Sequence, residues 1–472
     1  MKKPATLVDK IWDSHVIMDL GQNTYLIHVD RNFQHELAGA TSLNGIDKAG
    51  RKIRNVELAF AVMDHVLDTH PGRGDETPIP GGTGFIREFR QRATSHGIRL
   101  FDLDDPDQGI SHVISPELGI ALPGCTYVCG DSHTCTVGGV GALAFGIGST
   151  DVEHVFATQT IIQTKPKNMR VTFNGKLGRE VFAKDIILYL IAHIGAAGGI
   201  EHAAEFAGPV IRNLPIDGRL TICNMAVEFS ARTGIVAPDD MTLEYLNGRR
   251  FAPKGEMWEK AVAYWRTLPS DQGAYFDKEV DIDCNNVRPQ VTWGTSPEHS
   301  VAVDGRVPDP AQAPDSHSRM TMERAITYIG LEPGTPMEQV KIDAVFVGSC
   351  TNARLSDLRE AARILKGRKV VPGMRAVCSP GSYQTKLKAE SEGIDRIFRE
   401  AGFEWRESGC SMCMSGGAGG EGFSPGQHVL STTNRNFEDR QGRGVRSHLA
   451  SPVTVAASAI TGHITDPRKM GA

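Results

Sequence analysis

Short apolar runs alternate along this chain with glycine turns and longer amphipathic segments. Residues 126–129 (Thr-Tyr-Val-Cys) predict a buried strand that ends at a turn over residues 130–133. After a glycine-rich stretch, we expect Asp151 to cap a helix. The apolar face of that helix is formed by Val152, Val155 and Phe156. Strands and helices that alternate in this way are typical of α/β proteins.

The second half of the chain repeats the same order of elements. Residues 344–347 predict a buried strand, residues 348–352 a turn, and residues 355–365 a helix. A weaker strand is expected at residues 375–378, followed by a helix over about residues 383–393. The pattern therefore predicts at least two strand–turn–helix units in this half, both part of an α/β fold.

The stretch 296–318 interrupts this pattern. It carries Pro297, Pro308, Pro310 and Pro314 and little periodicity, which favours an extended connection over a packed element. Because 472 residues are too many for one hydrophobic core, we place a domain boundary there.

Composition and charge exclude several classes of protein. No run of eighteen apolar residues occurs, so we do not expect a membrane span. Charged residues at Asp9, Lys10 and Asp13 leave no room for an apolar signal region, so a cytoplasmic location is expected. A formal net charge of −5 argues against general nucleic-acid binding, which needs a basic surface. An anionic substrate would therefore need a local cluster of arginines.

Three of the nine cysteines suggest a metal or cluster site. Cys410 and Cys413 form a Cys-x-x-Cys pair, and Cys350 lies on the predicted turn after its own strand. A redox pair, a structural zinc site, an electron-transfer cluster and buried inert thiols are the alternatives, and spacing alone does not decide among them. The other six cysteines are expected to be structural.

Several short motifs resemble those of the aconitase/isopropylmalate isomerase family, and they occur in the family's order. They are Gly130-Asp131-Ser132-His133-Thr134, Gly348-Ser349-Cys350-Thr351-Asn352, Gly409-Cys410-Ser411-Met412-Cys413 and Asn434-Arg435-Asn436-Phe437. Further similar segments, such as Met63-Asp64-His65 and Arg440-Gln441-Gly442, run nearly from end to end. Several motifs in order are much more specific than any one of them.

The resemblance implies a fold of three α/β domains around a [4Fe–4S] cluster. Residues 1–295 would form the first two domains, 296–318 the connection, and 319–472 the third domain with the cluster cysteines. Cys350, Cys410 and Cys413 would hold the cluster and leave its fourth iron free of cysteine. The chain ends at Ala472 with nothing that resembles the family's swivelling fourth domain, so we expect that domain on a separate small subunit.

The resemblance also assigns expected site residues. The catalytic group would be Asp64, His65, His112, Asp131, Ser132, His133, Asn224 and Glu228, and the substrate-binding group would be Asn434, Arg435 and Arg440. An aspartate beside a histidine fixes the imidazole tautomer and raises its basicity, and arginine binds carboxylates at two points. Without the resemblance, Asp131 and Ser132 would be ordinary turn residues, and the arginines a solvated or RNA-binding loop.

The implied activity is a hydro-lyase reaction, the interconversion of 2- and 3-isopropylmalate. Two stretches depart from the isopropylmalate pattern, residues 66–85 after His65 and residues 414–422 after Cys413. Both lie beside motifs expected at the cluster, so both could change the shape of the substrate pocket. A hydratase acting on citraconate, dimethylmaleate or homoaconitate is therefore the alternative, and a non-enzymatic iron–sulfur protein is another.

Overall fold

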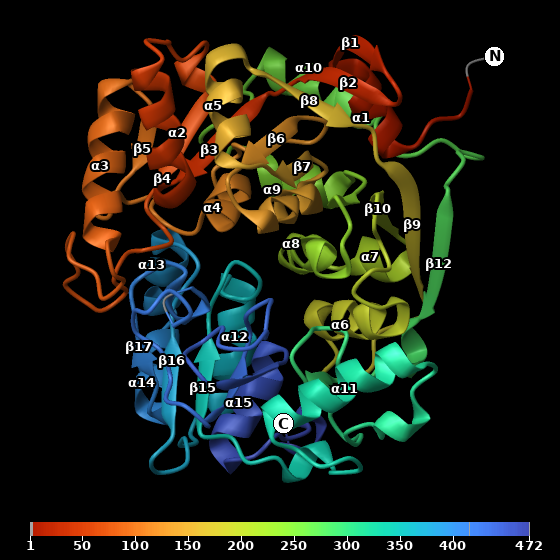
Figure 1. Ribbon diagram of the computed structural model, residues 1–472, viewed down its shortest axis with the longest axis vertical. Coiled ribbons are helices and arrows are strands. Elements are labelled where there is room, and N and C mark those ends of the chain that lie inside the picture. The colour runs from red at the N-terminus through yellow and green to blue at the C-terminus, as the bar shows by residue number, and fades with distance from the viewer. Residues whose placement is uncertain (1–2, 415, 472) are drawn as a thin grey trace. The chain divides into compact units, whose positions relative to one another are not determined.

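The chain divides into two compact units in the computed structural model (Figure 1), which describes residues 3–414 and 416–471. Unit 1 comprises Met1–His65, Thr83–Gly175 and Gly199–Asp283; unit 2 comprises Val66–Gly82, Lys176–Gly198 and Cys284–Ala472. Both units combine sheets and helices, as the alternating sequence pattern predicts. The division into three domains stays a prediction. Among the described residues, no helix is both long enough and apolar enough to span a bilayer.

Unit 1 is built on two parallel sheets and one antiparallel sheet. The first has the order β5-β4-β3-β6-β7 and the second β11-β10-β9-β12. Their strands are β3 (Arg31–His35), β4 (Ala59–Val62), β5 (Arg99–Phe101), β6 (Thr126–Cys129), β7 (Leu143–Gly146), β9 (Lys167–Asn174), β10 (His202–Ala207), β11 (Thr233–Val236) and β12 (Lys278–Asp283). The antiparallel sheet joins β1 (Val16–Gly21), β2 (Thr24–His28) and β8 (Thr160–Thr164).

Helices and a 3₁₀ segment pack against the first sheet of unit 1. The helices of the unit are α1 (Leu7–His15), α2 (Glu36–Lys48), α3 (Gly82–Ser95), α4 (Ser111–Glu117), α5 (Ser149–Thr158), α7 (Pro209–Asn213), α8 (Ile216–Asn224), α9 (Asp240–Leu246) and α10 (Glu256–Trp265). Apolar residues of α4, of α8 and of the 3₁₀ segment η2 (Ser132–Val140) share one core with Phe33, Phe60 and Tyr127 of the strands. This packing holds η2 against the sheet directly after β6.

Unit 2 contains one parallel sheet of order β17-β16-β15-β18-β19 and a β13-β14 hairpin. The strands are β13 (Gln290–Thr292), β14 (Ser300–Ala302), β15 (Ala344–Val347), β16 (Arg375–Cys378), β17 (Glu404–Trp405), β18 (His428–Ser431) and β19 (Arg446–Leu449). The helices are α6 (Ala183–Ile194), α11 (Ser316–Ile329), α12 (Leu355–Leu365), α13 (Tyr383–Ser391), α14 (Ile394–Ala401) and α15 (Pro452–Thr461). The hairpin pairs antiparallel, while all strands of the five-stranded sheet are parallel.

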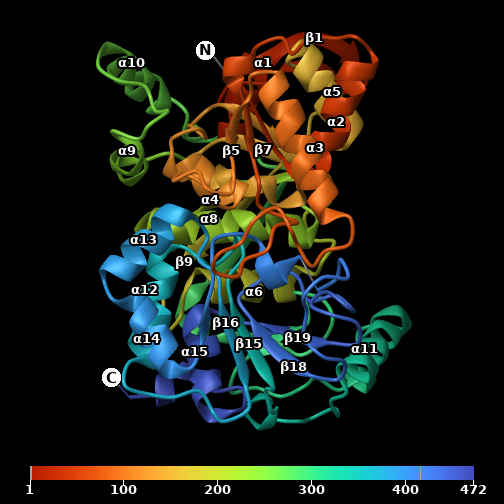
Figure 2. The ribbon, with the colours of Figure 1, turned by 90° about the vertical axis from the view of Figure 1, so that its left-hand side faces the viewer.

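The two faces of the unit 2 sheet have different neighbours. Val345 and Val347 pack with residues of α12, α14 and α15, which lie together on one side of the sheet in Figure 2. Ala344 and Phe346 point to the opposite face, where they pack with Met412 and Cys413. The two-residue period of a strand therefore places the cysteine loop on the face opposite the helices.

Most predicted elements occur where the pattern placed them. The strands at 126–129, 344–347 and 375–378 and the helix at 355–365 match β6, β15, β16 and α12, while α13 ends two residues before the predicted limit. The predicted cap at Asp151 is wrong, because α5 begins at Ser149 after Gly148 and Asp151 lies in its first turn. The buried face of that helix is Val152, Val155 and Phe156, as predicted.

The proline-containing stretch 296–318 is more packed than expected. It lies within unit 2 and contains β14 and a 3₁₀ turn, and it leads into α11. Val303 and Val307 are buried at 0% and 1% exposure. The prolines limit regular structure there, but these valines still join the unit 2 core, so the expectation of an unpacked extended connection was wrong for this part of the chain.

The glycines of η2 make that segment sensitive to substitution. A Cβ added at Gly138 would lie 1.9 Å from the carbonyl oxygen of Gly234 in β11, and one added at Gly139 would lie 2.7 Å from the backbone nitrogen of Leu220. Neither neighbour is a flexible side chain, so the strain has no cheap relief. We expect Gly138→Ala to lower the free energy of unfolding by about 3 kcal/mol.

Gly84→Ala is the matched control. Gly84 is an exposed residue of α3, and a Cβ added there meets no atom within 4 Å. It should stabilise unit 1 by about 0.5–1 kcal/mol. Denaturant titrations of both variants check the pair. Equal stability of the two variants would show that η2 does not need the close backbone approach to β11.

A chain of hydrogen-bonded histidines in unit 2 predicts acid sensitivity. His448 donates from Nδ1 to the carbonyl of Thr292 at 2.7 Å, so its Nε2 accepts from Nδ1 of His428 at 2.9 Å. Burial first, and then neighbouring positive groups, lower the pKa of His448 to about 3 and that of His428 to about 4. Arg446 lowers the pKa of His428, and Asp343 acts in the opposite sense.

The unfolded chain therefore binds protons below about pH 6.5 that the folded chain does not bind until about pH 4. Stability should fall as the pH is lowered through this window, by roughly 3 kcal/mol for each histidine. Urea titrations at pH 7, 5.5 and 4.5 measure the slope. His448→Asn keeps a donor toward Thr292 without a titrating ring and should reduce the slope of stability against pH. An unchanged slope would show that the histidine pair does not cause the acid sensitivity.

Candidate active site

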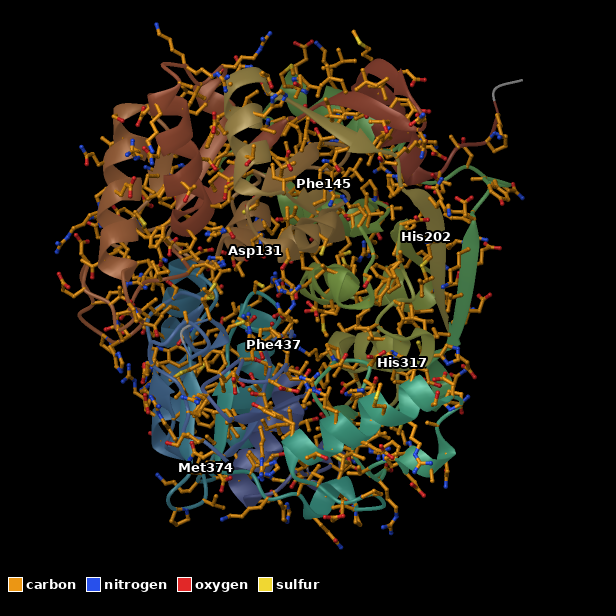
Figure 3. All side chains as sticks on the ribbon, in the orientation of Figure 1. Asp131, Phe145, His202, His317, Met374 and Phe437 are labelled. Atoms are coloured by element: carbon orange, nitrogen blue, oxygen red, sulfur yellow. The ribbon has the colours of Figure 1, made fainter. Side chains whose placement is uncertain are left out.

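Three neighbouring strands of unit 1 end at one cluster of ionisable side chains. His35 is the last residue of β3, Asp64 and His65 follow β4 by two and three positions, and Asp131 (labelled in Figure 3) lies two residues after β6. The strands β4, β3 and β6 are adjacent and parallel. Ligand sites of parallel sheets lie beyond the carboxyl ends of the strands, and this cluster has that position.

His65 lies between two carboxylates. Its Nδ1 is 2.5 Å from Oδ1 of Asp64, and its Nε2 is 2.8 Å from Oδ2 of Asp131. Burial alone would lower the pKa of His65, but the charges and hydrogen bonds of Asp64 and Asp131 outweigh it and raise the pKa well above 6.5. Both ring nitrogens therefore carry protons at neutral pH, and His65 is an imidazolium that donates in two directions.

Asp131 contacts three histidines of this cluster. Besides His65, its Oδ1 lies 3.3 Å from Nε2 of His112 and accepts a 2.5 Å hydrogen bond from the backbone N–H of His133. Burial opposes the charge of Asp131, but hydrogen bonds from the three histidines hold its pKa well below 3.8. Asp131 therefore caps η2, as its local sequence predicts, and also orients the histidines.

The remaining predicted residues of unit 1 lie on η2, at the end of α8 and on the 3₁₀ segment Met225–Phe229 that follows α8. Nε2 of His133 is 2.8 Å from Oε1 of Glu228, and Nδ2 of Asn224 donates to Oγ1 of Thr136 at 2.7 Å. Ser132 is exposed at the start of η2. The structure thus joins Asp64, His65, His112, Asp131, His133 and Glu228 through their polar contacts, and places Asn224 beside η2.

The sequence reading missed two residues of the cluster, Glu36 and His35. Glu36 accepts from the backbone N–H groups of Asp64 at 3.1 Å and His65 at 2.7 Å, and so fixes the turn that carries them. The His35 ring stacks on His65 with 4.0 Å between centroids. Burial and the charge of His65 lower the pKa of His35 to about 4, so it stays neutral. The available sequence signal was that these two adjacent polar residues lie where β3 ends and α2 begins.

The three predicted ligand cysteines lie in unit 2, where each is only 6–7% exposed. Cys350 lies on the turn between β15 and α12. Cys410 and Cys413 flank one 3₁₀ turn, closed by a 3.0 Å bond from the N–H of Cys413 to the carbonyl of Cys410. Met412, fully buried against the sheet, anchors that turn. The packing of this turn against β15 therefore fixes the position of both cysteines.

Polar side chains approach two of these sulfurs. Nδ2 of Asn434 lies 3.5 Å from Sγ of Cys350, and Oδ1 of the same amide lies 3.9 Å from Sγ of Cys413. Nη2 of Arg440 lies 3.5 Å from Sγ of Cys413. The three buried cysteines thus lie on two turns of the same unit, with N–H donors beside the sulfurs of Cys350 and Cys413. The donor set therefore fits a metal–sulfur cofactor.

The cysteines outside the predicted ligand set are buried or half-buried free thiols. No disulfide joins any of the nine cysteines, each of which the structure describes. Burial raises the pKa of Cys125 to about 12 and those of Cys129, Cys223 and Cys378 well above 9.0, which suits inert structural thiols.

The loop after β18 carries the predicted substrate-binding residues. Asn434 is fully buried, Arg435 and Arg440 are half-buried, and Phe437 (labelled in Figure 3) is 48% exposed. The guanidinium of Arg440 lies over the Phe437 ring, 5.3 Å from its centroid. Buried Lys184 donates to the carbonyls of Thr432 and Thr433 and so fixes the start of this loop. Lys184 is distant in sequence and gave no signal.

The comparisons with known proteins agree over almost the whole chain. The Aconitase family (aconitate hydratase) profile matches residues 9–462. The "3-isopropylmalate dehydratase large subunit 1" of Bradyrhizobium diazoefficiens is 55% identical over 465 residues, 98% of this chain and 97% of that protein. The "3-isopropylmalate dehydratase large subunit" of Roseiflexus castenholzii is 48% identical over 471 residues, 99% of each chain.

Among solved structures, the holo form of aconitase X from Thermococcus kodakaraensis aligns with a TM-score of 0.43 and 11% identity over 87% of this chain and 84% of that one. The family match, in contrast, covers the cysteine turns, the histidine–carboxylate cluster and the arginine loop. This chain belongs to the aconitase family.

Proposed function

We propose that the chain is the large subunit of a 3-isopropylmalate dehydratase, a hydro-lyase that interconverts 2- and 3-isopropylmalate by removing and adding water. Two relatives of that name, similar over nearly their whole length, support the substrate. The structural observation that carries the proposal is the buried three-cysteine site, which has Asn434 and Arg440 beside the sulfurs of Cys350 and Cys413.

Cys350, Cys410 and Cys413 would hold a [4Fe–4S] cluster, since aconitase-family enzymes typically use an iron–sulfur cofactor. When bound through three cysteines, such a cluster supplies an open iron as a Lewis acid for the substrate hydroxyl. Asn434 and Arg440 would donate to the sulfurs of the ligand cysteines Cys350 and Cys413, and Arg440 could also bind a substrate carboxylate. Arg435, on the same loop, is the second candidate for a substrate carboxylate.

The unit 1 cluster would manage the protons of the departing and returning water. His65, protonated between Asp64 and Asp131, is a donor whose orientation is fixed from both sides. His133, paired with Glu228, and His112, beside Asp131, complete a connected set of acids and bases. Ser132 and Asn224 flank this set as candidate substrate contacts.

A small subunit that carries the swivelling domain would complete the enzyme, and the cytoplasm would be its location. The words "large subunit" in the names of both relatives support a partner. The base that removes the carbon-bound proton would come from that partner. We therefore expect the purified chain alone to be inactive, and full turnover by the single chain would contradict this part of the proposal.

The test is anaerobic co-expression with a candidate small subunit, followed by an alkene-absorbance assay. The panel comprises 2- and 3-isopropylmalate, citrate, homocitrate, 2-methylmalate and 2,3-dimethylmalate. We expect kcat/KM for the isopropylmalates to exceed that for every other substrate by at least about tenfold, which is about 1.4 kcal/mol of discrimination. Iron and sulfide analysis of the same sample distinguishes a cluster from a colourless zinc site.

A related hydro-lyase acting on another substituted malate is the second candidate. The observation that favours it is that both departing stretches, 66–85 and 414–422, lie in part beside the cysteine loop in unit 2. Preference for a smaller or doubly substituted malate in the panel would select this candidate. No hydration activity on any substrate, with iron and sulfide present, would point to a non-enzymatic iron–sulfur protein instead.

A further inference from the structure

Two stretches that depart from the family pattern meet in unit 2. We call residues 66–82 the strap and residues 416–422 the glycine loop; Ser415 lies outside the described residues. Nε2 of His70 in the strap lies 3.8 Å from Oε1 of Glu421 in the glycine loop. A Cβ on Gly419 would meet Pro80 of the strap at 3.6 Å. The two departures are therefore neighbours.

Glu421 fixes the glycine loop to the sheet through two arginines. The Arg406 side chain is only 2% exposed, and its Nη1 and Nη2 donate to the two oxygens of Glu421 at 2.6 and 2.9 Å. Arg375, on β16, also pairs with Glu421, and both arginines pair with Glu404 on β17. A planar guanidinium bound at two points fixes orientation as well as position.

The glycine loop in turn packs against the arginine loop. A Cβ on Gly416 would lie 2.4 Å from the carbonyl carbon of Gln441, and one on Gly422 would lie 2.8 Å from the Gln441 carbonyl oxygen. Such backbone contact is open only to glycine at these positions. Gln441 directly follows Arg440, whose guanidinium lies 3.5 Å from Sγ of Cys413. A shift of the glycine loop therefore moves Arg440 relative to the cysteine site.

The strap braces the other side of the cysteine turn. Oγ1 of Thr69 is 2.9 Å from Oγ of Ser411, which directly follows Cys410 in the turn and has a positive φ of 48°. The N–H of Glu407 donates to the carbonyl of Thr69 at 2.7 Å, and Arg73 donates to the carbonyl of Ser408 at 2.5 Å. The Cys410–Cys413 turn is thus enclosed by the strap and, through Arg440, by the glycine loop.

We propose that Glu421, held by Arg406 and Arg375, is a positioning residue that sets where Arg440 lies against the cysteine site and so determines substrate affinity. Glu421 is held by the two arginines and acts through the contact of Gly416 and Gly422 with Gln441. The inference deepens the proposed function at the same site and rests on it for the substrate readout alone.

The test compares Glu421→Gln with the matched control Glu392→Gln. Glu392 forms a two-point pair with Arg359 in the same unit, but at the exposed surface between α12 and the end of α13. The first readout is the alkylation rate of Cys413 in the cluster-free chain, followed by mass spectrometry, which needs neither cluster nor turnover. The second is the separate measurement of KM and kcat for isopropylmalate in the assembled enzyme.

We expect Glu421→Gln to raise the Cys413 alkylation rate and KM by about tenfold each, with kcat within about threefold. Glu392→Gln should leave all three unchanged. Arg375→Met, which releases only one arginine, should give a smaller rise of about threefold and keeps the test decisive should Glu421→Gln fail to fold. Alkylation and KM within about twofold of the natural chain in both Glu421→Gln and Arg375→Met would overturn the proposal.

The two proposals fail in different ways. A natural complex that does not turn over isopropylmalate, together with faster Cys413 alkylation in Glu421→Gln, would reject the substrate and keep Glu421 as a positioning residue. Turnover of isopropylmalate with unchanged alkylation and KM would keep the enzyme and reject the role of Glu421.

Discussion

The Asp131→Asn variant of the assembled enzyme is expected to turn over substrate roughly 10³-fold more slowly than the natural chain, with little change in KM. Asp131 accepts from His65 and the backbone of His133, and it lies beside His112. An amide keeps the shape of the side chain but loses the charge and one accepting oxygen. The histidines then lose both their fixed orientation and the interaction that holds a proton on His65.

The pH profile separates this electrostatic role from a purely structural one. The pKa of His65 is raised, so the stability gained from its charge is present below pH 6.5 and lost as the pH rises through the higher folded-state pKa. Asp131→Asn removes one of the two carboxylates responsible. We therefore expect the basic limb of the kcat profile to move to lower pH in the variant.

Asp47→Asn is the matched control, because Asp47 forms a 2.8 Å pair with Nε2 of His96 at the surface of the same unit. It should change neither kcat nor the pH profile. An Asp131→Asn enzyme with natural kcat and an unmoved basic limb would show that the pairing of His65 with Asp131 has no part in catalysis.

Cys350→Ala should abolish the cluster and reduce activity at least about 10³-fold, because one of its three thiolate ligands is lost. The cluster-free chain should stay folded, because Cys350 lies on the turn between β15 and α12 and the substitution removes only one sulfur atom. Iron and sulfide content and the visible absorbance of the anaerobically purified chain measure the loss directly.

Cys378→Ala is the control for the loss of a buried thiol. Cys378 ends β16, the strand beside β15, and burial raises its pKa well above 9.0. This variant should keep natural iron content and activity and lose only modest stability, about 1 kcal/mol. If Cys350→Ala kept its cluster, or if both variants lost it equally, Cys350 would not be a ligand.

The sequence was most informative where a local pattern has a local cause. Strand β15 and helix α12 occur at the predicted residues, because four consecutive apolar positions and an apolar face with helical spacing leave few other arrangements. The expected cap at Asp151 is wrong by three residues, because the N-cap is Gly148 and a helix can begin at any of several positions within one turn. The ordered motifs identified the family, and the near-full-length relatives bear this out.

Contacts between distant residues were beyond the sequence. Glu36, Lys184 and Arg406 are buried charged side chains, and each is stabilised by partners that only folding brings near. In the sequence, the strap and the glycine loop are two distant stretches that differ from the family pattern. In the structure they lie side by side, with His70 3.8 Å from Glu421.

The sequence by itself determined the α/β class, most of the strands and helices, the family, and the residue types available for cluster and proton chemistry. Only the tertiary structure decided that His65 lies between two carboxylates, that Asn434 and Arg440 lie beside the cysteine sulfurs, and that Glu421 is held by Arg406. The physical reason is that secondary structure follows from neighbours in the chain. The charge state and orientation of a side chain depend instead on the groups that folding places around it.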